Sequence, residues 1–194
     1  MELLDQFVEV FAQGLKLADA KLPRASSSKR EYQAGIGPHT EPETVRLALE
    51  EIVSNYLLEI NPELSVKYPN YPRNKCDLLL RSSPDPLYIE IKMMRILGDN
   101  GKPNDNIIKH ILSPYQHDRS ALTDIGKLKA SGFEGKKAIL IYGYESEEFP
   151  LSFVIEAFEK LADKNIVEAC EASFEGLVHP VHQRGAVFGW IVAE

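Results

Sequence analysis

Apolar residues recur at helical intervals along several stretches of the chain, and polar residues fill the positions between them. This pattern gives a helix one apolar face that packs against a core and one polar face that meets water. Residues 2–21 show it most clearly, and Pro23 ends that stretch. The pattern predicts helices over residues 2–21, 41–60, 106–112, 117–130 and 150–163.

Two helix starts can be assigned from residue type. Thr40 suits an N-cap position, and Glu43 follows it at the spacing of a capping box. Pro42 suits the first turn of the same helix. Asp118 is the expected cap of the helix over 117–130.

Short runs of apolar and β-branched residues predict strands between these helices. Residues 136–143 form a continuous apolar run after charged residues, which is typical of a buried central strand. Residues 24–37 are polar and lack an apolar period, so we expect a surface loop there. The alternative is that its basic residues order on a phosphate backbone. Further strands are expected over residues 64–68, 172–178 and 186–192.

Residues 76–93 are the most informative stretch, because two strand-like runs flank the turn formers at Ser83–Pro86. That arrangement predicts an antiparallel hairpin. If the loop is Ser83–Pro86, Asp77 lies opposite Lys92, and Leu79 lies opposite Glu90.

Side chains alternate between faces along a strand, and cross-strand partners share a face. We therefore expect Asp77, Glu90 and Lys92 to converge on one side of the hairpin. The other side should be apolar, with Leu78, Leu80, Ile89 and Ile91.

Two carboxylates at this separation repel each other unless a positive charge lies between them. Lys92 alone does not neutralise both Asp77 and Glu90. Carboxylate oxygens are the ligands that Mg²⁺ prefers, and a metal beside a lysine is an arrangement that hydrolyses phosphodiesters. The alternative is a solvated hairpin face, because acidic and basic residues alternate on many exposed strands.

Asp77 and the Glu90-Ile91-Lys92 triplet resemble the motif of the PD-(D/E)XK nuclease superfamily. Cys76 stands where the motif has proline, which is its least demanding element chemically. The resemblance implies a restriction-endonuclease-like α/β fold, a central mixed β-sheet flanked by helices. Its order of helix, three strands, helix and strand would cover about residues 41–144 of a single domain, 1–194. The N-terminal helix and the C-terminal helix and hairpin would be additions.

The resemblance also implies an activity, that of a Mg²⁺-dependent endodeoxyribonuclease in which Mn²⁺ may substitute. Asp77, Glu90 and the Ile91 carbonyl would bind the metal, and Lys92 would position the attacking water. Members commonly add an acid from the preceding helix. Glu41 suits that role, because it falls within about 40° of Val45 on the helical wheel. Glu43 is the second choice.

Restriction-type cleavage ranks first among the nuclease roles, because the chain length suits a homodimer that cuts both strands of double-stranded DNA. Residues 98–128 also look like the region that follows the motif in type II restriction enzymes. A repair or junction-resolving nuclease is the alternative on the same core. A DNA- or protein-binding module without catalysis is the alternative from another class.

Charge is divided unevenly along the 194 residues. Residues 138–194 hold 3 of the 22 basic and 10 of the 29 acidic residues, which accounts for the whole net charge of −7. The balanced region before them can supply phosphate contacts. We expect the acidic C-terminal portion to face away from DNA, except for the tip at residues 182–184. The expected DNA-binding residues are Arg30, Arg73, Lys75, Arg95 and Lys102, with Arg24 and Lys29 as further candidates for the cleft.

Other features of the sequence bear on location and on metal chemistry. We expect no membrane span and no N-terminal signal, and hence a cytoplasmic protein with Cys76 and Cys170 reduced. The His179-x-x-His182 pair gives zinc little support, because no third ligand lies at useful spacing.

Overall fold

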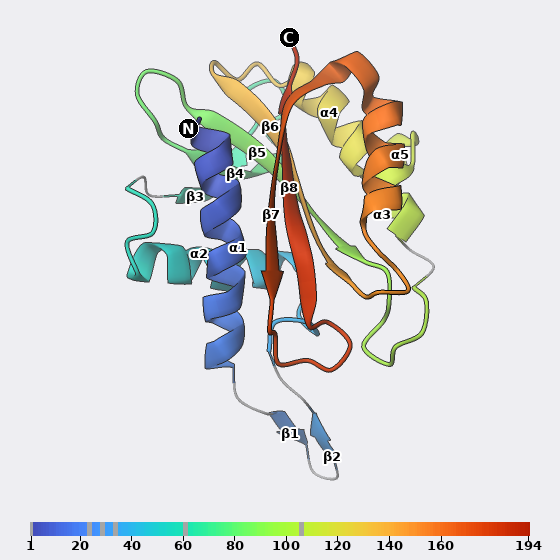
Figure 1. Ribbon diagram of the computed structural model, residues 1–194. Coiled ribbons are helices and arrows are strands. Elements are labelled where there is room, and N and C mark those ends of the chain that lie inside the picture. Colours follow the sequence, from blue (N-terminus) through green and yellow to red (C-terminus); the bar gives the residue numbers. More distant parts are fainter. Residues whose placement is uncertain (1, 23–24, 28–29, 33–34, 60–61, 105–106) are drawn as a thin grey trace.

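A computed structural model describes residues 2–22, 25–27, 30–32, 35–59, 62–104 and 107–194 (Figure 1). A six-stranded mixed sheet forms the centre, with helices on both of its faces. The prediction of a mixed α/β architecture is therefore confirmed. In spatial order the strands are β3 (Pro62–Lys67), β4 (Lys75–Leu80), β5 (Leu87–Arg95), β6 (Lys136–Glu145), β8 (Arg184–Val192) and β7 (Ile166–Glu175).

The strands β5 and β6 are parallel, and all other neighbours in this sheet are antiparallel. A parallel pair needs a long crossover, which here carries the helices α3 (Ile107–Leu112) and α4 (Ala121–Lys129) and a 3₁₀ turn at Gln116–Asp118. The hairpin expected as an addition after the core continues this same sheet, because β8 pairs with β6.

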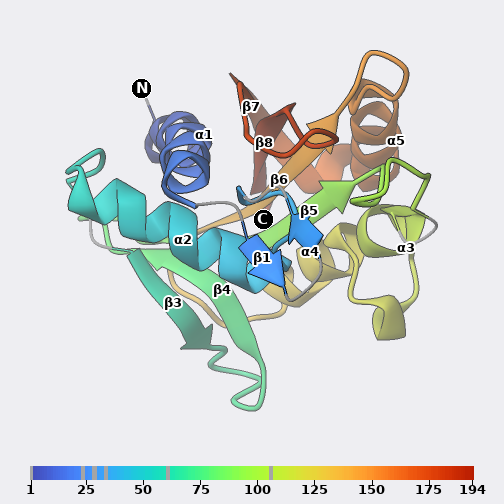
Figure 2. The ribbon, with the colours of Figure 1, turned by 90° about the horizontal axis from the view of Figure 1, so that it is seen from below.

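Helices cover the two faces of the sheet separately (Figure 2). On one face α1 (Leu3–Lys21) and α2 (Glu41–Ser54) pack against an apolar core that includes Leu78 and Leu140. On the other face α3, α4 and α5 (Ser152–Ala162) enclose a second core that includes Ile139. The helices predicted over residues 2–21 and 150–163 are thus confirmed as α1 and α5.

The two edges of the sheet differ from its interior. At one edge β7 exposes most of its side chains and contains an irregularity between Val167 and Cys170, where Glu168 has a left-handed φ of 54°. At the other edge β3 begins with Pro62.

A glycine permits the close approach of β8 to its neighbour. A Cβ atom on Gly185 would lie 1.8 Å from the carbonyl oxygen of Gly143 in β6 and 2.7 Å from the ring of Phe174. The backbone can pass here only because glycine has no side chain.

Several predicted boundaries are wrong. The second helix ends at Ser54 rather than residue 60, and Tyr56 follows with a left-handed φ of 52° and 90% of its surface exposed. Residues 60–61 lie outside the described residues. The predicted loop over 24–37 contains the short strands β1 (Ala25–Ser27) and β2 (Arg30–Tyr32), which pair with each other.

The predicted caps also need correction. Thr40 occupies the N-cap position of α2, but Glu43 pairs with Nδ1 of His39 at 2.9 Å rather than closing a capping box. The cap of α4 is Ser120 rather than Asp118, because the Ser120 hydroxyl accepts a hydrogen bond from the Thr123 backbone. Within the described ranges, every helix is too short or too polar to cross a membrane.

Candidate functional site

The hairpin of β4 and β5 forms in a register different from the predicted one. Leu78 pairs with Ile89 and Leu80 with Leu87, so the loop runs from Arg81 to Pro86 and is two residues longer than expected. Continuing this register brings Asp77 level with Glu90 rather than with Lys92. The shift is even, so the predicted division of side chains between the two faces still holds.

The two faces of the hairpin have the expected chemistry. Leu78, Leu80, Ile89 and Ile91 are buried in the core beneath α1 and α2. Glu90 points to the opposite face, where only 2% of its surface is exposed.

The Asp77 side chain links β4 to β5 through a hydrogen bond. Its Oδ2 accepts a hydrogen bond from the backbone N–H of Ile91 at 2.8 Å. This bond holds the carboxylate against β5 beyond the last paired residues. Asp77 thereby remains next to Glu90, and its charge raises the pKa of Glu90.

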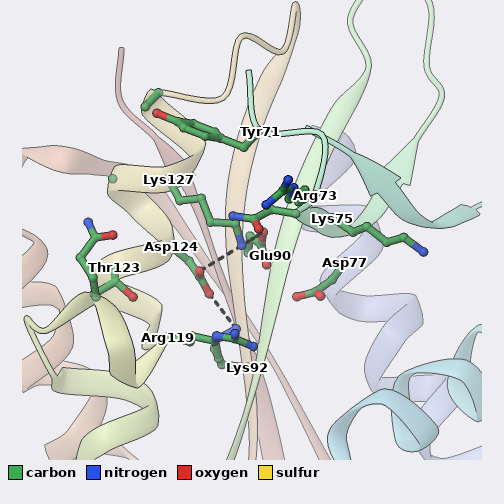
Figure 3. A pocket seen from close by; sticks show the side chains of 14 residues that line it. Tyr71, Arg73, Lys75, Asp77, Glu90, Lys92, Arg119, Thr123, Asp124 and Lys127 are labelled. Atoms are coloured by element: carbon green, nitrogen blue, oxygen red, sulfur yellow. Dashed lines mark hydrogen bonds and ion pairs between the residues drawn. The ribbon is translucent and has the colours of Figure 1, made fainter. Parts of the chain in front are cut away.

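The helix α4 supplies one acidic and one basic partner for the charged groups of β5 (Figure 3). Asp124 Oδ2 lies 2.7 Å from Nζ of Lys92, and Lys127 Nζ lies 2.6 Å from Oε1 of Glu90. Lys127 also reaches Asp124 Oδ1 at 3.3 Å, so a chain of ion pairs joins Glu90, Lys127, Asp124 and Lys92. The side chains of Asp124 and Lys127 both reach the β4–β5 hairpin.

Tyr68 completes the surroundings of Glu90. Its hydroxyl donates a hydrogen bond to Oε1 of Glu90, and its ring lies 4.9 Å from the ammonium of Lys127. Glu90 therefore meets a hydroxyl and an ammonium on one side and the carboxylate of Asp77 on the other.

Glu41 approaches β5 from the start of α2. Its Oε2 accepts a hydrogen bond from the backbone N–H of Met93 at 2.5 Å. Burial raises the pKa of Glu41, the charge of Lys92 opposes that rise, and Asp77 adds to it. Glu41 is therefore part of the same electrostatic cluster, whereas Glu43 is exposed and pairs with His39.

Burial and neighbouring charges set the protonation of the cluster. Burial, and then the charges of Asp77 and Asp124, raise the pKa of Glu90 well above its usual range. For Lys92, burial favours the neutral form, but the carboxylates of Asp124, Glu41 and Asp77 outweigh it and raise the pKa. Lys92 is thus held as an ammonium ion.

Part of this cluster lines a surface pocket of about 700 Å³ between α4 and the segment that precedes β4. Asp77, Glu90 and Lys92 line it, and Tyr71 stands at its upper side in Figure 3. Basic side chains also line the pocket, and they are Arg73, Lys75, Arg119 and Lys127.

The predicted DNA-binding residues differ in whether their side chains are exposed, are engaged in internal contacts, or lie outside the described residues. Arg73 and Lys75 line the pocket and are exposed, and Lys102 is exposed on a loop after β5. Arg95 is instead engaged internally, because its guanidinium donates to the His39 carbonyl at 2.6 Å and pairs with Asp99. The backbone of Arg30 lies in β2, but its side chain and all of Arg24 and Lys29 are outside the described residues.

The predicted contact at the C-terminal tip is wrong for His182. Only 1% of its surface is exposed, and its Nε2 lies 3.0 Å from Oδ1 of Asp99. The ring of His179 stacks on it with centroids 4.8 Å apart. Burial lowers the pKa of His182 to about 4.

The two most important omissions of the sequence-based reasoning are Asp124 and Lys127. Asp124 falls on the same helical stripe as Ala121, Ile125 and Leu128, which are all buried. A charged residue within an apolar stripe was the available signal, because a buried carboxylate requires a partner.

In the ranges described here, no group of three His, Cys, Asp or Glu side chains is spaced for metal coordination as the side chains now lie. Comparison of the chain with models of protein families, with curated protein sequences and with solved structures found no match. The candidate function therefore depends on the chemistry of the pocket alone.

Proposed function

We propose that this pocket hydrolyses DNA phosphodiester bonds with the help of Mg²⁺, which Mn²⁺ can replace. The observation that carries the proposal is the adjacency of Asp77 and Glu90, with Lys92 on the same strand face, in a pocket with basic walls. Acidic groups for a cation and basic groups for a phosphate then serve one site.

The acids fit a hard divalent cation. Glu90 is buried and faces the charge of Asp77, which raises the pKa of Glu90, so the two carboxylates repel each other. A dication removes that repulsion, and oxygen atoms are the donors that Mg²⁺ takes. Asp77, Glu90 and the Ile91 carbonyl would hold it, with Glu41 as an additional acid from α2. When bound, the cation supplies Lewis-acid activation of a water and neutralises charge on the phosphate.

Lys92 has a specific place in this scheme. Its neighbouring carboxylates raise its pKa, so in the metal-free site Lys92 is an ammonium ion that donates hydrogen bonds. The ion pair with Asp124 holds its Nζ in place, and Lys92 lines the pocket. We assign Lys92 to orient the attacking water and to stabilise the negative charge that develops on the phosphate.

The topology supports a restriction-endonuclease-like arrangement. The chain order is α2, β3, β4, β5, α3, α4, β6, with β5 parallel to β6. It matches the implied order of helix, three strands, helix and strand, except that the crossover carries two helices. Arg73, Lys75 and Arg119 are the phosphate-binding candidates on the walls of the pocket.

We further propose that the protein acts as a homodimer on double-stranded DNA. The chain carries a single Asp77, Glu90 and Lys92 set, so two chains are needed to cut both strands in one binding event. Light scattering measures the mass in solution. A monomer that still makes double-strand breaks in one binding event would contradict this assembly.

The proposal is tested by incubating the protein with plasmid DNA and Mg²⁺, with and without EDTA. We expect cleavage that EDTA prevents, leaving 5′-phosphate and 3′-hydroxyl ends. Calorimetry should detect Mn²⁺ binding that Asp77→Ala removes and that Asp85→Ala, in the exposed β4–β5 loop, retains. DNA binding without cleavage under all metal conditions would favour the non-catalytic module instead.

A further inference from the structure

Lys127 lies between the buried acids and the open pocket. Its Nζ is 2.6 Å from Oε1 of Glu90, whereas its side chain remains 28% exposed. It also lines the pocket that contains the phosphate-binding candidates. A flexible four-carbon stem allows this ammonium to reach more than one position.

The two lysines of the cluster differ in how firmly they are held. Lys92 is 12% exposed, and Asp124, Glu41 and Asp77 all stabilise its charge. Lys127 is more exposed, and its short contact to Glu90 is made to an acid of the proposed metal site. Lys127 is therefore the cation that can be exchanged with least loss.

A divalent cation and Lys127 compete for the same carboxylate. A dication on Asp77 and Glu90 would place two positive charges beside the ammonium, and that repulsion in a partly buried site is large. It would also take the Glu90 charge that now attracts Lys127. Both effects move the Lys127 ammonium away from Glu90.

We infer that Lys127 is an internal counter-cation that holds Glu90 until a divalent cation displaces it into the pocket. The inference rests on the proposed metal site. The released ammonium joins Arg73, Lys75 and Arg119 on the walls of the pocket, where it binds a phosphodiester anion. Metal binding and recognition of the phosphate are then coupled through one side chain.

The first test is the Mn²⁺ affinity of the full chain, measured by calorimetry. Lys127→Met removes the competitor, so we expect binding to tighten about tenfold. The control is Lys129→Met, which removes a positive charge from an exposed position on the same helix, α4. Exposed charges are screened, so the control should change the affinity by less than about twofold. Unchanged or weaker binding to Lys127→Met would overturn the inference, and so would equal tightening in both variants.

The second test uses the unmodified protein and does not depend on the folding of a variant. A short pulse of acetic anhydride followed by mass spectrometry measures the reactivity of each lysine. We expect the reactivity of Lys127 relative to Lys75 to rise severalfold when Mn²⁺ is added. Asp77→Ala should abolish that rise. A ratio that stays constant at saturating Mn²⁺ would refute displacement.

These measurements separate two kinds of failure. If the wild-type protein binds Mn²⁺ and cleaves DNA while Lys127 is unaffected, only the role of Lys127 is refuted. If the wild-type protein binds no divalent cation, the proposed function fails and this inference fails with it.

Discussion

Asp124→Asn tests the energetic importance of the ion-pair cluster, because it removes one charge and preserves the volume of the side chain. Asp124 is 4% exposed and pairs with both Lys92 and Lys127. Removing one partner of a buried pair costs about 3–5 kcal/mol, because the other charge is left buried without compensation. Lys92 retains Glu41 and Asp77 nearby, so we expect a loss near the lower limit, about 3 kcal/mol.

The assay is urea unfolding in metal-free buffer. The control is Glu50→Gln, which removes the carboxylate of an exposed pair with Arg46 in α2. Exposed helical pairs contribute about 0.3–0.5 kcal/mol, so the control should change the free energy of unfolding only slightly. A loss below about 1 kcal/mol in Asp124→Asn would show that the buried charges are not coupled as described.

Three further predictions have defined outcomes. Lys92→Ala should retain DNA affinity in filter binding but lower the single-turnover cleavage rate by orders of magnitude, and normal cutting would refute its role. Burial lowers the pKa of His182 to about 4, so its stabilisation is present above about pH 6.5 and is lost as pH falls towards 4. His182→Gln should therefore flatten the pH dependence of unfolding in that window, and an unchanged slope would contradict this. In urea unfolding, Gly185→Ala should lower the free energy of unfolding by about 3 kcal/mol or more, because the new Cβ would collide with Gly143. Gly126→Ala, which has open space around its Cβ, should raise that free energy slightly. Similar effects of the two substitutions would refute the steric argument.

Apolar periodicity predicted much of the architecture. It located α1, α5 and the buried strand β6, because each segment shows its buried face directly in the residue pattern. Strand alternation also assigned the side chains of β4 and β5 to the correct faces. These are local properties, and one sequence is sufficient to read them.

The hairpin register could not be read in the same way. Turn formers located the loop but did not fix its length. In the structure the Ser82 N–H donates to the Leu80 carbonyl at 3.1 Å, so Arg81 and Ser82 belong to the turn rather than to the ladder. Residue type did not distinguish this longer loop from the four-residue one.

The partners of the site acids were missed for a different reason. Asp124 and Lys127 come from the crossover between two parallel strands, and they meet Glu90 and Lys92 only in the tertiary structure. Asp124 lies on the buried stripe of α4 although it is charged. A paired acid inside a core satisfies both observations.

The edges of the sheet have a consequence for aggregation. An exposed edge strand offers unpaired backbone groups to other chains, and charged residues, bulges and proline oppose such pairing. At one edge β7 combines its irregularity with exposed Glu168, Glu171 and Glu175. At the other, β3 begins with Pro62, which has no N–H to donate. These features oppose the pairing of β7 or β3 with a strand of another copy of the chain, and thus the growth of this sheet into a fibril.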